Sequence, residues 1–358
     1  MHSNKNDYPL TQPTYYQKLR AAGYHVMGCG KIDLHKNTLE WGLDGKRLTE
    51  QWGFSDAIDN AGKMDAVRAG LEKPTDPYMA MLHKRNLHKV HVDDMRGRKG
   101  YAATYPTPLP DDAYCDNWIN ENAKELLHRA PRNKPWHLVV NFTGPHNPMD
   151  ITRAMDSMCR GREFPQPNRN TEHGEKVHVA IRQNYAAMCE NIDTRIGELL
   201  AEVERRGEMD NTLVVFASDH GEMLGDHNRW AKHVPYQASA GIPMIVAGLD
   251  AGKSVRTDAL TSLIDVGATF LDYAGAGTMP AMEARSLRGI VTGKQKKHRE
   301  IVHSALEEWK LVWDGRHKYV EGFSKTPELY DLQADPGENE NRVTSEKPMA
   351  ERLRRALI

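Results

Sequence analysis

The sequence has few cysteines, no excess of charge of one sign and no long hydrophobic run. Its four cysteines, among 358 residues, form no Cys-x-x-Cys pair and no zinc-type spacing, so we expect free thiols. The 48 basic and 49 acidic residues leave a formal charge of -1, which excludes the basic surface expected of a nucleic-acid-binding protein. No apolar run approaches the roughly 18 residues that span a bilayer, so we expect no membrane partner.

The start of the chain also lacks a hydrophobic stretch. Residues 1–7 carry no apolar core of a signal peptide, so the sequence as it stands predicts no secretion and leaves the compartment open. The composition, 39% hydrophobic and 27% charged, is typical of a globular protein. A chain of 358 residues can bury a sizeable core, and we expect one large domain and a smaller one, with the oligomeric state undefined.

Strand-length apolar runs alternate with amphipathic helices over most of the chain. The runs that predict strands lie at 24–28, 136–142, 213–217 and 242–247. The stretches that predict helices lie at 14–22, 112–129, 179–206 and 262–273. The segments 36–110 and 147–174 lack periodicity and predict loops and short elements. This order predicts an α/β domain over residues 1–276, with a mostly parallel sheet flanked by helices.

The character of the chain changes after Gly275-Ala276-Gly277. The apolar runs become short and are separated by turns, at 301–305, 310–313, 317–322 and 329–332. A helical pattern follows near 348–358. We therefore expect a small C-terminal subdomain over residues 277–358, built from an antiparallel sheet and a helix.

The strand predicted at 213–217 runs into a cluster of carboxylates and imidazoles. Asp219 and His220 follow it directly, within Ser218-Asp219-His220-Gly221-Glu222, and Gly225-Asp226-His227 comes next. Ligands of α/β proteins collect at the carboxyl ends of buried strands. Asp219 and His220 are therefore candidate ligands of a divalent cation. The structural alternative is a capped turn between the strand and the next element.

Two candidate oxyanion-binding residues, Lys232 and His146, lie outside the Asp219 segment. Lys232, in Trp230-Ala231-Lys232-His233, can pair with a bound oxyanion, although a solvated surface lysine is the alternative. His146 follows the strand predicted at 136–142 and stands between Pro145 and Pro148, which restrict the backbone. It can hydrogen-bond an oxyanion or protonate a leaving group, or it can be structural.

A third cationic candidate is Lys31, in Gly28-Cys29-Gly30-Lys31-Ile32-Asp33-Leu34-His35. The glycines allow close backbone approach to a ligand, and the lysine adds a point charge. The segment is not a Walker loop, which has a longer glycine spacing before Lys-Ser/Thr.

Other polar clusters favour structural interpretations. His83, His88 and His91 stand among Lys and Arg, so we expect a solvated basic surface there rather than a metal site. The acid-rich segment Asp335-Pro336-Gly337-Glu338 is typical of a turn.

Taken in order, these segments resemble the sulfatases of the alkaline phosphatase superfamily. Gly30-Lys31 after Leu19-Arg20-Ala21-Ala22-Gly23-Tyr24 resembles the family's Gly-Lys-x-His segment after Leu-x-x-Ala-Gly-Tyr. Thr143-Gly144-Pro145-His146 resembles the Pro-His segment, and the Asp219 segment with Trp230-x-Lys232 resembles the second metal half-site and the sulfate-binding lysine. Glu328-Leu329-Tyr330-Asp331-Leu332 with residues 335–338 resembles the C-terminal sheet motif.

The resemblance implies an alkaline-phosphatase-like fold and hydrolysis of a small-molecule or carbohydrate sulfate ester. It implies Asp219 and His220 as ligands of a divalent cation, with calcium expected and magnesium or manganese as alternatives. It also implies that Lys31, Lys232 and His146 are catalytic and hold the sulfate or the bridging oxygen. The family's second histidine of Gly-Lys-x-His is Asp33 here, and His35 is its nearest substitute in a catalytic role.

The chain departs from the family at the nucleophile. The family's opening strand carries two metal-binding aspartates and a Cys-x-Pro/Ala-x-Arg motif whose Cys or Ser becomes formylglycine, and neither occurs in these 358 residues. We therefore expect an N-terminally truncated catalytic domain with negligible turnover. Two alternatives stay open: a phosphodiester or phosphonate ester hydrolase of the same superfamily, and a non-catalytic remnant or sulfate-ester-binding protein.

Overall fold

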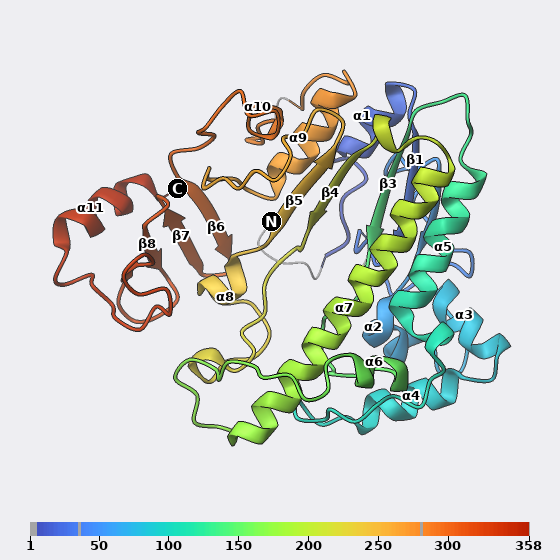
Figure 1. Ribbon diagram of the computed structural model, residues 1–358, viewed down its shortest axis with the longest axis horizontal. Coiled ribbons are helices and arrows are strands. Elements are labelled where there is room, and N and C mark those ends of the chain that lie inside the picture. Colours follow the sequence, from blue (N-terminus) through green and yellow to red (C-terminus); the bar gives the residue numbers. More distant parts are fainter. Residues whose placement is uncertain (1–5, 35–36, 280–281, 358) are drawn as a thin grey trace.

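The first part of the chain builds a three-stranded parallel sheet. The computed structural model describes residues 6–34, 37–279 and 282–357. The central strand of this sheet, β1 (His25–Gly30), pairs in parallel with β2 (Asp56–Asp59) and with β3 (Trp136–Asn141). Helices α1 (Tyr15–Ala21) and α5 (Cys115–Arg129) pack against β1, which is why Val26–Gly30 are buried (Figure 1). The parallel arrangement brings the carboxyl ends of β1 and β3 to one edge.

A second, two-stranded sheet lies beside the first. β4 (Leu213–Ala217) and β5 (Met244–Gly248) are antiparallel, and no described strand joins them to the three-stranded sheet. Figure 1 shows the strands of both sheets running in nearly the same direction, with β4 and β5 to the left of β3 and of the long helix α7 (Glu175–Arg205). The cross-strand partners Phe216 and Ile245 are 38% and 61% exposed, so one face of this pair carries uncovered apolar surface.

The C-terminal subdomain is an antiparallel sheet covered by one helix. Its strands are β6 (Val302–Leu306), β7 (Trp309–Trp313), β8 (His317–Glu321) and β9 (Glu328–Asp331), paired in that order. Helix α11 (Lys347–Ala356) packs on β7 and β8, and a small apolar core forms between them. The division of the chain at residue 276 stays a prediction.

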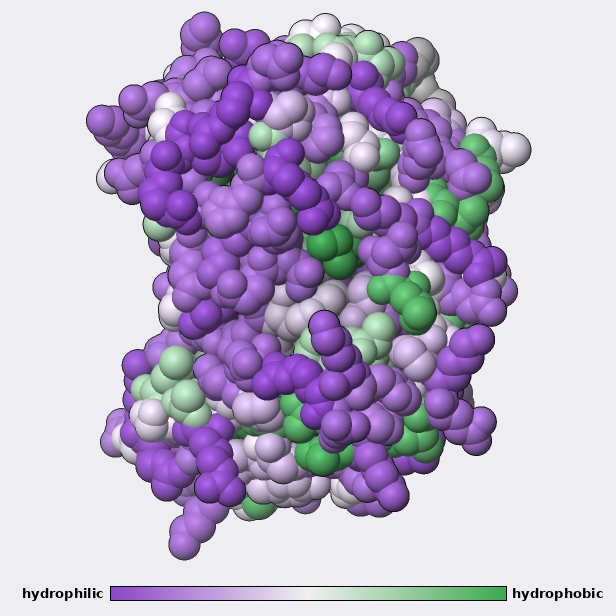
Figure 2. Space-filling model, turned by 90° about the vertical axis from the view of Figure 1, so that its right-hand side faces the viewer, coloured by the Kyte–Doolittle hydropathy of each residue, from purple (hydrophilic) through white to green (hydrophobic). Residues whose placement is uncertain are grey.

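Short helices lie between the strands of these sheets along the chain. They are α2 (Gly62–Ala69), α3 (Pro77–Lys84), α4 (His88–Gly97), α6 (Arg153–Met158), α8 (Gln237–Ala240), α9 (Ile264–Tyr273) and α10 (Arg288–Val291), with 3-10 turns η1 (Asp111–Ala113), η2 (Met209–Asn211) and η3 (Asp226–Asn228). In the part of the chain that is described, no helix is both long and apolar enough to cross a bilayer. The face in Figure 2 is mostly hydrophilic with scattered apolar side chains, so apolar surface is not concentrated there.

The α/β fold class is confirmed, but the segment 36–110 is more ordered than its composition predicts. The short elements expected there are β2 and three helices of 8, 8 and 10 residues. Helix α3 begins at Pro77 after Asp76, whose side chain accepts a hydrogen bond from Met79, a start signal that periodicity alone does not detect.

The histidine interpretation for this segment is wrong at His91. This residue is 1% exposed and its Nε2 bonds the Lys63 carbonyl oxygen at 3.0 Å, so it belongs to the core and not to a solvated surface. His83 and His88 stack on each other with ring centroids 3.8 Å apart.

Candidate active site

Lys31 lies at the carboxyl end of β1, next to the end of β3. Its backbone N–H donates to the Asn141 carbonyl oxygen at 3.0 Å, and Asn141 Nδ2 donates back to the Lys31 carbonyl at 3.2 Å. Gly30 makes this approach possible, because it has φ +103° and a Cβ there would lie 2.1 Å from the Asn141 oxygen. The Lys31 ammonium lies 2.6 Å from both carboxylate oxygens of Asp33 and 3.8 Å from Asp65.

His146 lies in the loop that leaves β3, and a buried carboxylate fixes the start of this loop. Asp116, in the first turn of α5, accepts hydrogen bonds from the backbone N–H groups of Thr143 at 2.6 Å and Gly144 at 3.0 Å, and from the Thr143 hydroxyl at 2.9 Å. Burial raises the pKa of Asp116, while Lys63 and these hydrogen bonds oppose that shift. Asp116 therefore anchors the loop through three donors.

A buried ion pair fixes the other end of the same loop. Lys63 Nζ lies 2.5 Å from Asp150 Oδ1 and donates to the Pro148 carbonyl oxygen at 3.1 Å. Both side chains are only 3% exposed. Charges that are desolvated to this degree are stable only when they are paired. The His146 loop thus runs between two buried, charged anchors.

Lys232 meets His146 directly, although the two residues stand 86 positions apart in the sequence. Lys232 Nζ lies 2.7 Å from His146 Nε2, and His146 Nδ1 lies 2.6 Å from the Asn147 carbonyl oxygen. This geometry fits a neutral imidazole that donates from Nδ1 to Asn147 and accepts from Lys232 at Nε2.

The charge state of His146 follows from these contacts. Desolvation, and then the Lys232 ammonium, lower the pKa of His146 to about 4. The His146 residue is exposed, so burial is incomplete. The short distance to the Lys232 ammonium is therefore the cause of the lowered pKa that the structure shows directly. At neutral pH the positive charges on this part of the site therefore reside on Lys31 and Lys232.

Asp219 and His220 directly follow β4, as predicted, but they are not surrounded by further metal-binding side chains among the described residues. The Asp219 side chain is 82% exposed. Its carboxylate accepts from the His220 backbone N–H at 3.0 Å and lies 3.4 Å from His220 Nε2, while His220 Nδ1 lies 2.7 Å from the Gly221 carbonyl oxygen. Among the described residues, no group of three or more His, Cys, Asp or Glu side chains is placed to hold a metal ion. Two ligands alone do not complete a site for a hard cation, so the metal stays a prediction.

The neighbours of this pair have structural partners. Glu222 accepts from the backbone N–H groups of Ala231 at 2.5 Å and Leu224 at 3.2 Å, and from the Tyr101 hydroxyl at 3.0 Å. His227 Nε2 lies 2.8 Å from the Gly337 carbonyl oxygen, and the ring stacks on Tyr236. His35 lies outside the described residues.

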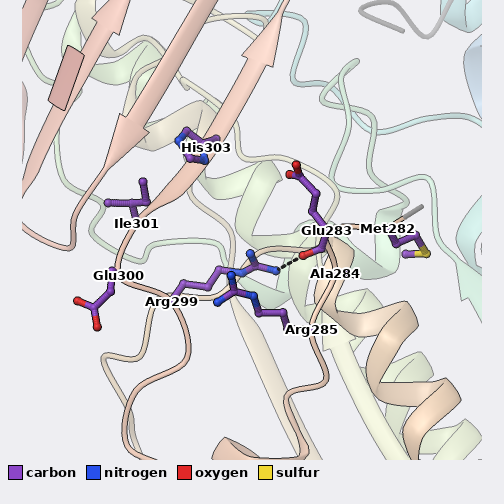
Figure 3. A pocket seen from close by; sticks show the side chains of 8 residues that line it. All are labelled: Met282, Glu283, Ala284, Arg285, Arg299, Glu300, Ile301 and His303. Carbon is purple, nitrogen blue, oxygen red and sulfur yellow. Dashed lines mark hydrogen bonds between the residues drawn. The ribbon is translucent and has the colours of Figure 1, made fainter. Parts of the chain in front are cut away.

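A cavity of about 570 Å³ lies away from these residues. It is lined by Met282, Glu283, Ala284, Arg285, Arg299, Glu300, Ile301 and His303 (Figure 3). Arg299 donates to the Glu283 carbonyl oxygen at 3.0 Å, which Figure 3 marks, and through its Nε to Asp265 at 3.0 Å. The cavity contains none of the predicted site residues, so the chemistry is assigned to the sheet edge instead.

Sequence reasoning missed the anchoring residues Asp116, Lys63 and Asp150. Lys63 lies in a segment for which only loops and short elements were predicted, and Asp116 lies in a helix whose apolar positions alone were informative. A polar residue that is buried by tertiary contacts gives no periodic signal. The only sequence signal for Asp116 is an acidic residue in the first turn of a helix, which is common for other reasons.

The family model described as Sulfatase matches residues 1–276, and the model described as N-sulphoglucosamine sulphohydrolase, C-terminal, matches residues 225–357. An arylsulfatase of Clostridium perfringens is 25% identical over 378 residues, which cover 96% of this chain and 77% of that protein. A choline-sulfatase of Rhizobium meliloti is 24% identical and covers 95% of this chain and 69% of its own length. Human arylsulfatase K is 26% identical, covering 92% and 64% respectively.

Solved structures share the fold over nearly all of the chain. A phosphonate monoester hydrolase from Silicibacter pomeroyi superposes with a TM-score of 0.79 at 20% identity, covering 99% of this chain and 80% of that one. A protein solved in complex with its substrate D-glucosamine-2-N,6-O-disulfate superposes with a TM-score of 0.73 at 17% identity, covering 99% and 83%. Because the sulfatase model matches most of the sequence, from residue 1 to residue 276, the chain belongs to the sulfatase family.

Proposed function

We propose that the chain binds the sulfate group of a sulfuric ester at the edge where β1 and β3 end. Lys31 and Lys232 would hold the sulfate oxygens, and His146 would contact the bridging oxygen. The observation that carries this proposal is the 2.7 Å contact between Lys232 and His146, which joins two distant segments beside the end of β1. Two lysines around a neutral imidazole suit a tetrahedral oxyanion with one ester oxygen.

Each residue would have a distinct role in ester cleavage. The two lysines act as point charges that offset the negative charge on the sulfate and on the departing oxygen. In the unliganded chain Lys232 donates to His146 Nε2 and His146 Nδ1 bonds Asn147, so both ring nitrogens have partners and the imidazole is neutral. His146 would contact the bridging oxygen after the bound sulfate replaces Nε2 as the partner of the Lys232 ammonium. The anchors Asp116 and Lys63 keep this imidazole in place without contacting the ester.

The nucleophile and the cation stand apart from this set. No Cys-x-Pro/Ala-x-Arg motif occurs in the 358 residues, so we expect the chain on its own to turn over sulfate esters negligibly. Asp219 and His220 are proposed as two ligands of a divalent cation, with calcium expected. Such a cation supplies a Lewis acid to a sulfatase, and the described residues provide only part of its coordination.

The names of the relatives support the proposed substrate class. Those with the names arylsulfatase and choline-sulfatase, and the neighbour solved with a glucosamine disulfate, favour a small-molecule or carbohydrate sulfate ester. A phosphonate monoester is the second candidate, because phosphonate monoester hydrolases share this fold with TM-scores of 0.79 and 0.78. Both esters present a tetrahedral group with one negative charge to the same lysines.

Binding to the chain separates the two candidates without requiring turnover. NMR spectra of the ¹⁵N-labelled histidine rings would be recorded during titration with 4-nitrophenyl sulfate and, separately, with a 4-nitrophenyl phosphonate monoester. We expect the His146 signals to move on addition of the sulfate ester, and this response to be lost in Lys232→Met. Preference for the phosphonate ester by tenfold or more would favour the second candidate, and no response to either ester would refute the proposal.

A further inference from the structure

The backbone around Lys232 is strained on both sides of the lysine. Ala231 has φ +62° and His233 has φ +79°, which are left-handed conformations that residues with a Cβ adopt uncommonly. Such conformations persist only where the surrounding structure imposes them. The position of Lys232 therefore depends on what holds the residues before and after it.

The upstream side is held by the catalytic domain itself. The Ala231 N–H donates to Glu222 at 2.5 Å, and the Ala231 carbonyl oxygen accepts from the Met223 N–H at 2.9 Å. Both contacts belong to the turn that follows Asp219 and His220. They fix Ala231 but do not reach the residues after Lys232.

The downstream side is held by the C-terminal sheet. The Trp309 indole N–H, on β7, donates to the His233 carbonyl oxygen at 3.0 Å. Lys318, on β8, donates to the Pro235 carbonyl oxygen at 2.7 Å. Glu338, in the loop after β9, accepts from the Gln237 N–H at 2.5 Å. His233 and Pro235 in the loop, and Gln237 at the start of α8, are thus bonded by side chains of the C-terminal subdomain.

Two of these side chains are a buried ion pair. Lys318 and Glu338 form a salt bridge, and their side chains are 1% and 3% exposed. The loop that carries Glu338 is itself tied back to the catalytic domain, because Asn168 Nδ2 donates to the Gly337 carbonyl oxygen at 2.8 Å and His227 bonds the same oxygen. A buried ion pair rarely stabilises a protein much more than apolar residues would. Because each partner of this pair also bonds the backbone of residues 235–237, we assign the pair a positioning role.

We propose that the Lys318–Glu338 pair, with Trp309, positions Lys232 against His146, so that the C-terminal subdomain sets the geometry of sulfate binding. This inference rests on the proposed function for its consequence, but the contact between Lys232 and His146 can be tested separately. Lys318, Glu338 and Trp309 are positioning residues, because their bonds are to the backbone of residues 233, 235 and 237 and they act through it.

The test compares Lys318→Met and Trp309→Phe with a matched control, Arg98→Met. Arg98 and Asp94 are also a buried ion pair, with side chains 0% and 4% exposed, and Arg98 also donates to a backbone carbonyl oxygen, that of Ala103, at 2.9 Å. Trp309→Phe keeps an aromatic ring but removes the N–H donor together with part of the indole, and it remains informative if Lys318→Met does not fold.

Two quantities would be measured on the full chain: the dissociation constant for inorganic sulfate, and the pKa of the His146 imidazole by NMR. Lys31 and Lys63 also lower that pKa, and neither is altered in these variants. We expect Lys318→Met to weaken sulfate binding about tenfold, the size of one charge-assisted contact. We also expect it to raise the His146 pKa toward its ordinary value. Trp309→Phe should do the same to a smaller extent, and Arg98→Met should do neither.

The outcomes separate this inference from the proposed function. Suppose Lys318→Met and Trp309→Phe keep the wild-type sulfate affinity and His146 pKa, while Lys232→Met binds sulfate more weakly and raises the His146 pKa. The positioning role is then refuted and the proposed function stands. If the wild-type chain does not bind sulfate, the proposed function fails. In that case, a raised His146 pKa in Lys318→Met would still support the positioning of Lys232, and an unchanged one would overturn it.

Discussion

The basic part of the candidate site, Lys31, His146 and Lys232, is linked to buried side chains, whereas the bonds of the acidic pair Asp219 and His220 within the described residues stay in its own turn. The His146 loop is bonded by Asp116, which is 1% exposed, and by the Lys63–Asp150 pair. Asp219 is 82% exposed and contacts its neighbour in the sequence. The described chain therefore supplies the rigid support that oxyanion binding needs, but not the set of ligands that a cation needs.

The difference matters for what the chain can do alone. Groups that stabilise developing charge are effective when they are fixed before the substrate arrives. The basic residues meet this requirement through buried anchors, so we expect them to bind a sulfate ester without the cation. Substitutions and ligand titrations can test whether the two parts of the site differ in this way.

The largest effect is expected from breaking the Lys63–Asp150 pair. Lys63→Met leaves Asp150 charged and buried, and we expect it to lower the free energy of unfolding by about 3–5 kcal/mol in urea denaturation. Asp219→Asn should change it by less than about 0.5 kcal/mol, because that side chain is exposed and bonds only within its turn. The double variant Lys63→Met/Asp150→Leu should recover part of the loss. Similar losses in Lys63→Met and Asp219→Asn would remove the contrast between the two parts.

A second prediction concerns the protonation of His146. Lys232→Met removes the nearest positive charge, so the pKa of His146 should rise from about 4 toward the ordinary 6.5, read from NMR titration of the histidine rings. In the wild type the folded pKa lies below the unfolded one, so the unfolded state binds this proton more readily. The contribution of His146 to stability should therefore be complete above pH 6.5 and decline as the pH falls to about 4. An unchanged pKa in Lys232→Met would contradict the contact.

A third prediction concerns Asp33, which stands where the resemblance implies a histidine. Its carboxylate lies 2.6 Å from the Lys31 ammonium and competes there with any bound oxyanion. Asp33→Asn should tighten the binding of inorganic sulfate about fivefold, equivalent to about 1 kcal/mol for a partly exposed pair. Asp193→Asn, on the exposed side of α7, makes the same change in net charge and is the control. Equal effects of the two substitutions would mean that only the net charge matters.

The smallest effect is expected from calcium. If the described residues provide only two ligands, a few millimolar CaCl₂ stays below the dissociation constant and should shift the Tm by less than about 1 °C. MgCl₂ at the same concentration controls for ionic strength. A Tm shift of several degrees that disappears in Asp219→Asn would show that the chain completes a metal site. It would contradict the view that Asp219 and His220 are an incomplete set of ligands.

The sequence predicted the elements that carry strong apolar patterns. The strand at 213–217 was expected with the bounds that β4 has, because all five of its residues are apolar. The periodic helix at 179–206 corresponds to α7, which begins four residues earlier, at Glu175. Helices α2 to α4 were not delimited within the segment 36–110, because they have only 8, 8 and 10 residues and buried polar residues such as Lys63 and His91 interrupt their apolar pattern.

Sequence reasoning placed the site residues better than their supports. Lys232 and His146 were expected at one site, and the structure brings them to 2.7 Å. Glu338 was interpreted as part of a turn. The turn is confirmed, because the Glu338 N–H donates to the Asp335 carbonyl oxygen at 3.1 Å, but the burial of the Glu338 side chain against Lys318 was not predicted. A buried ion pair between β8 and a loop 20 positions later depends on the packing of the whole subdomain, which no local pattern encodes.

The most direct test of the account is the affinity of the chain for 4-nitrophenyl sulfate in four single variants. We predict that Lys31→Met, His146→Gln and Lys232→Met each weaken binding about tenfold, the size of one charge-assisted contact, whereas Asp219→Asn leaves it within about twofold of the wild type. Weakening by Asp219→Asn as large as that by Lys232→Met, or no weakening in any of the three basic-site variants, would contradict the claim that these residues form a preorganised oxyanion site on their own.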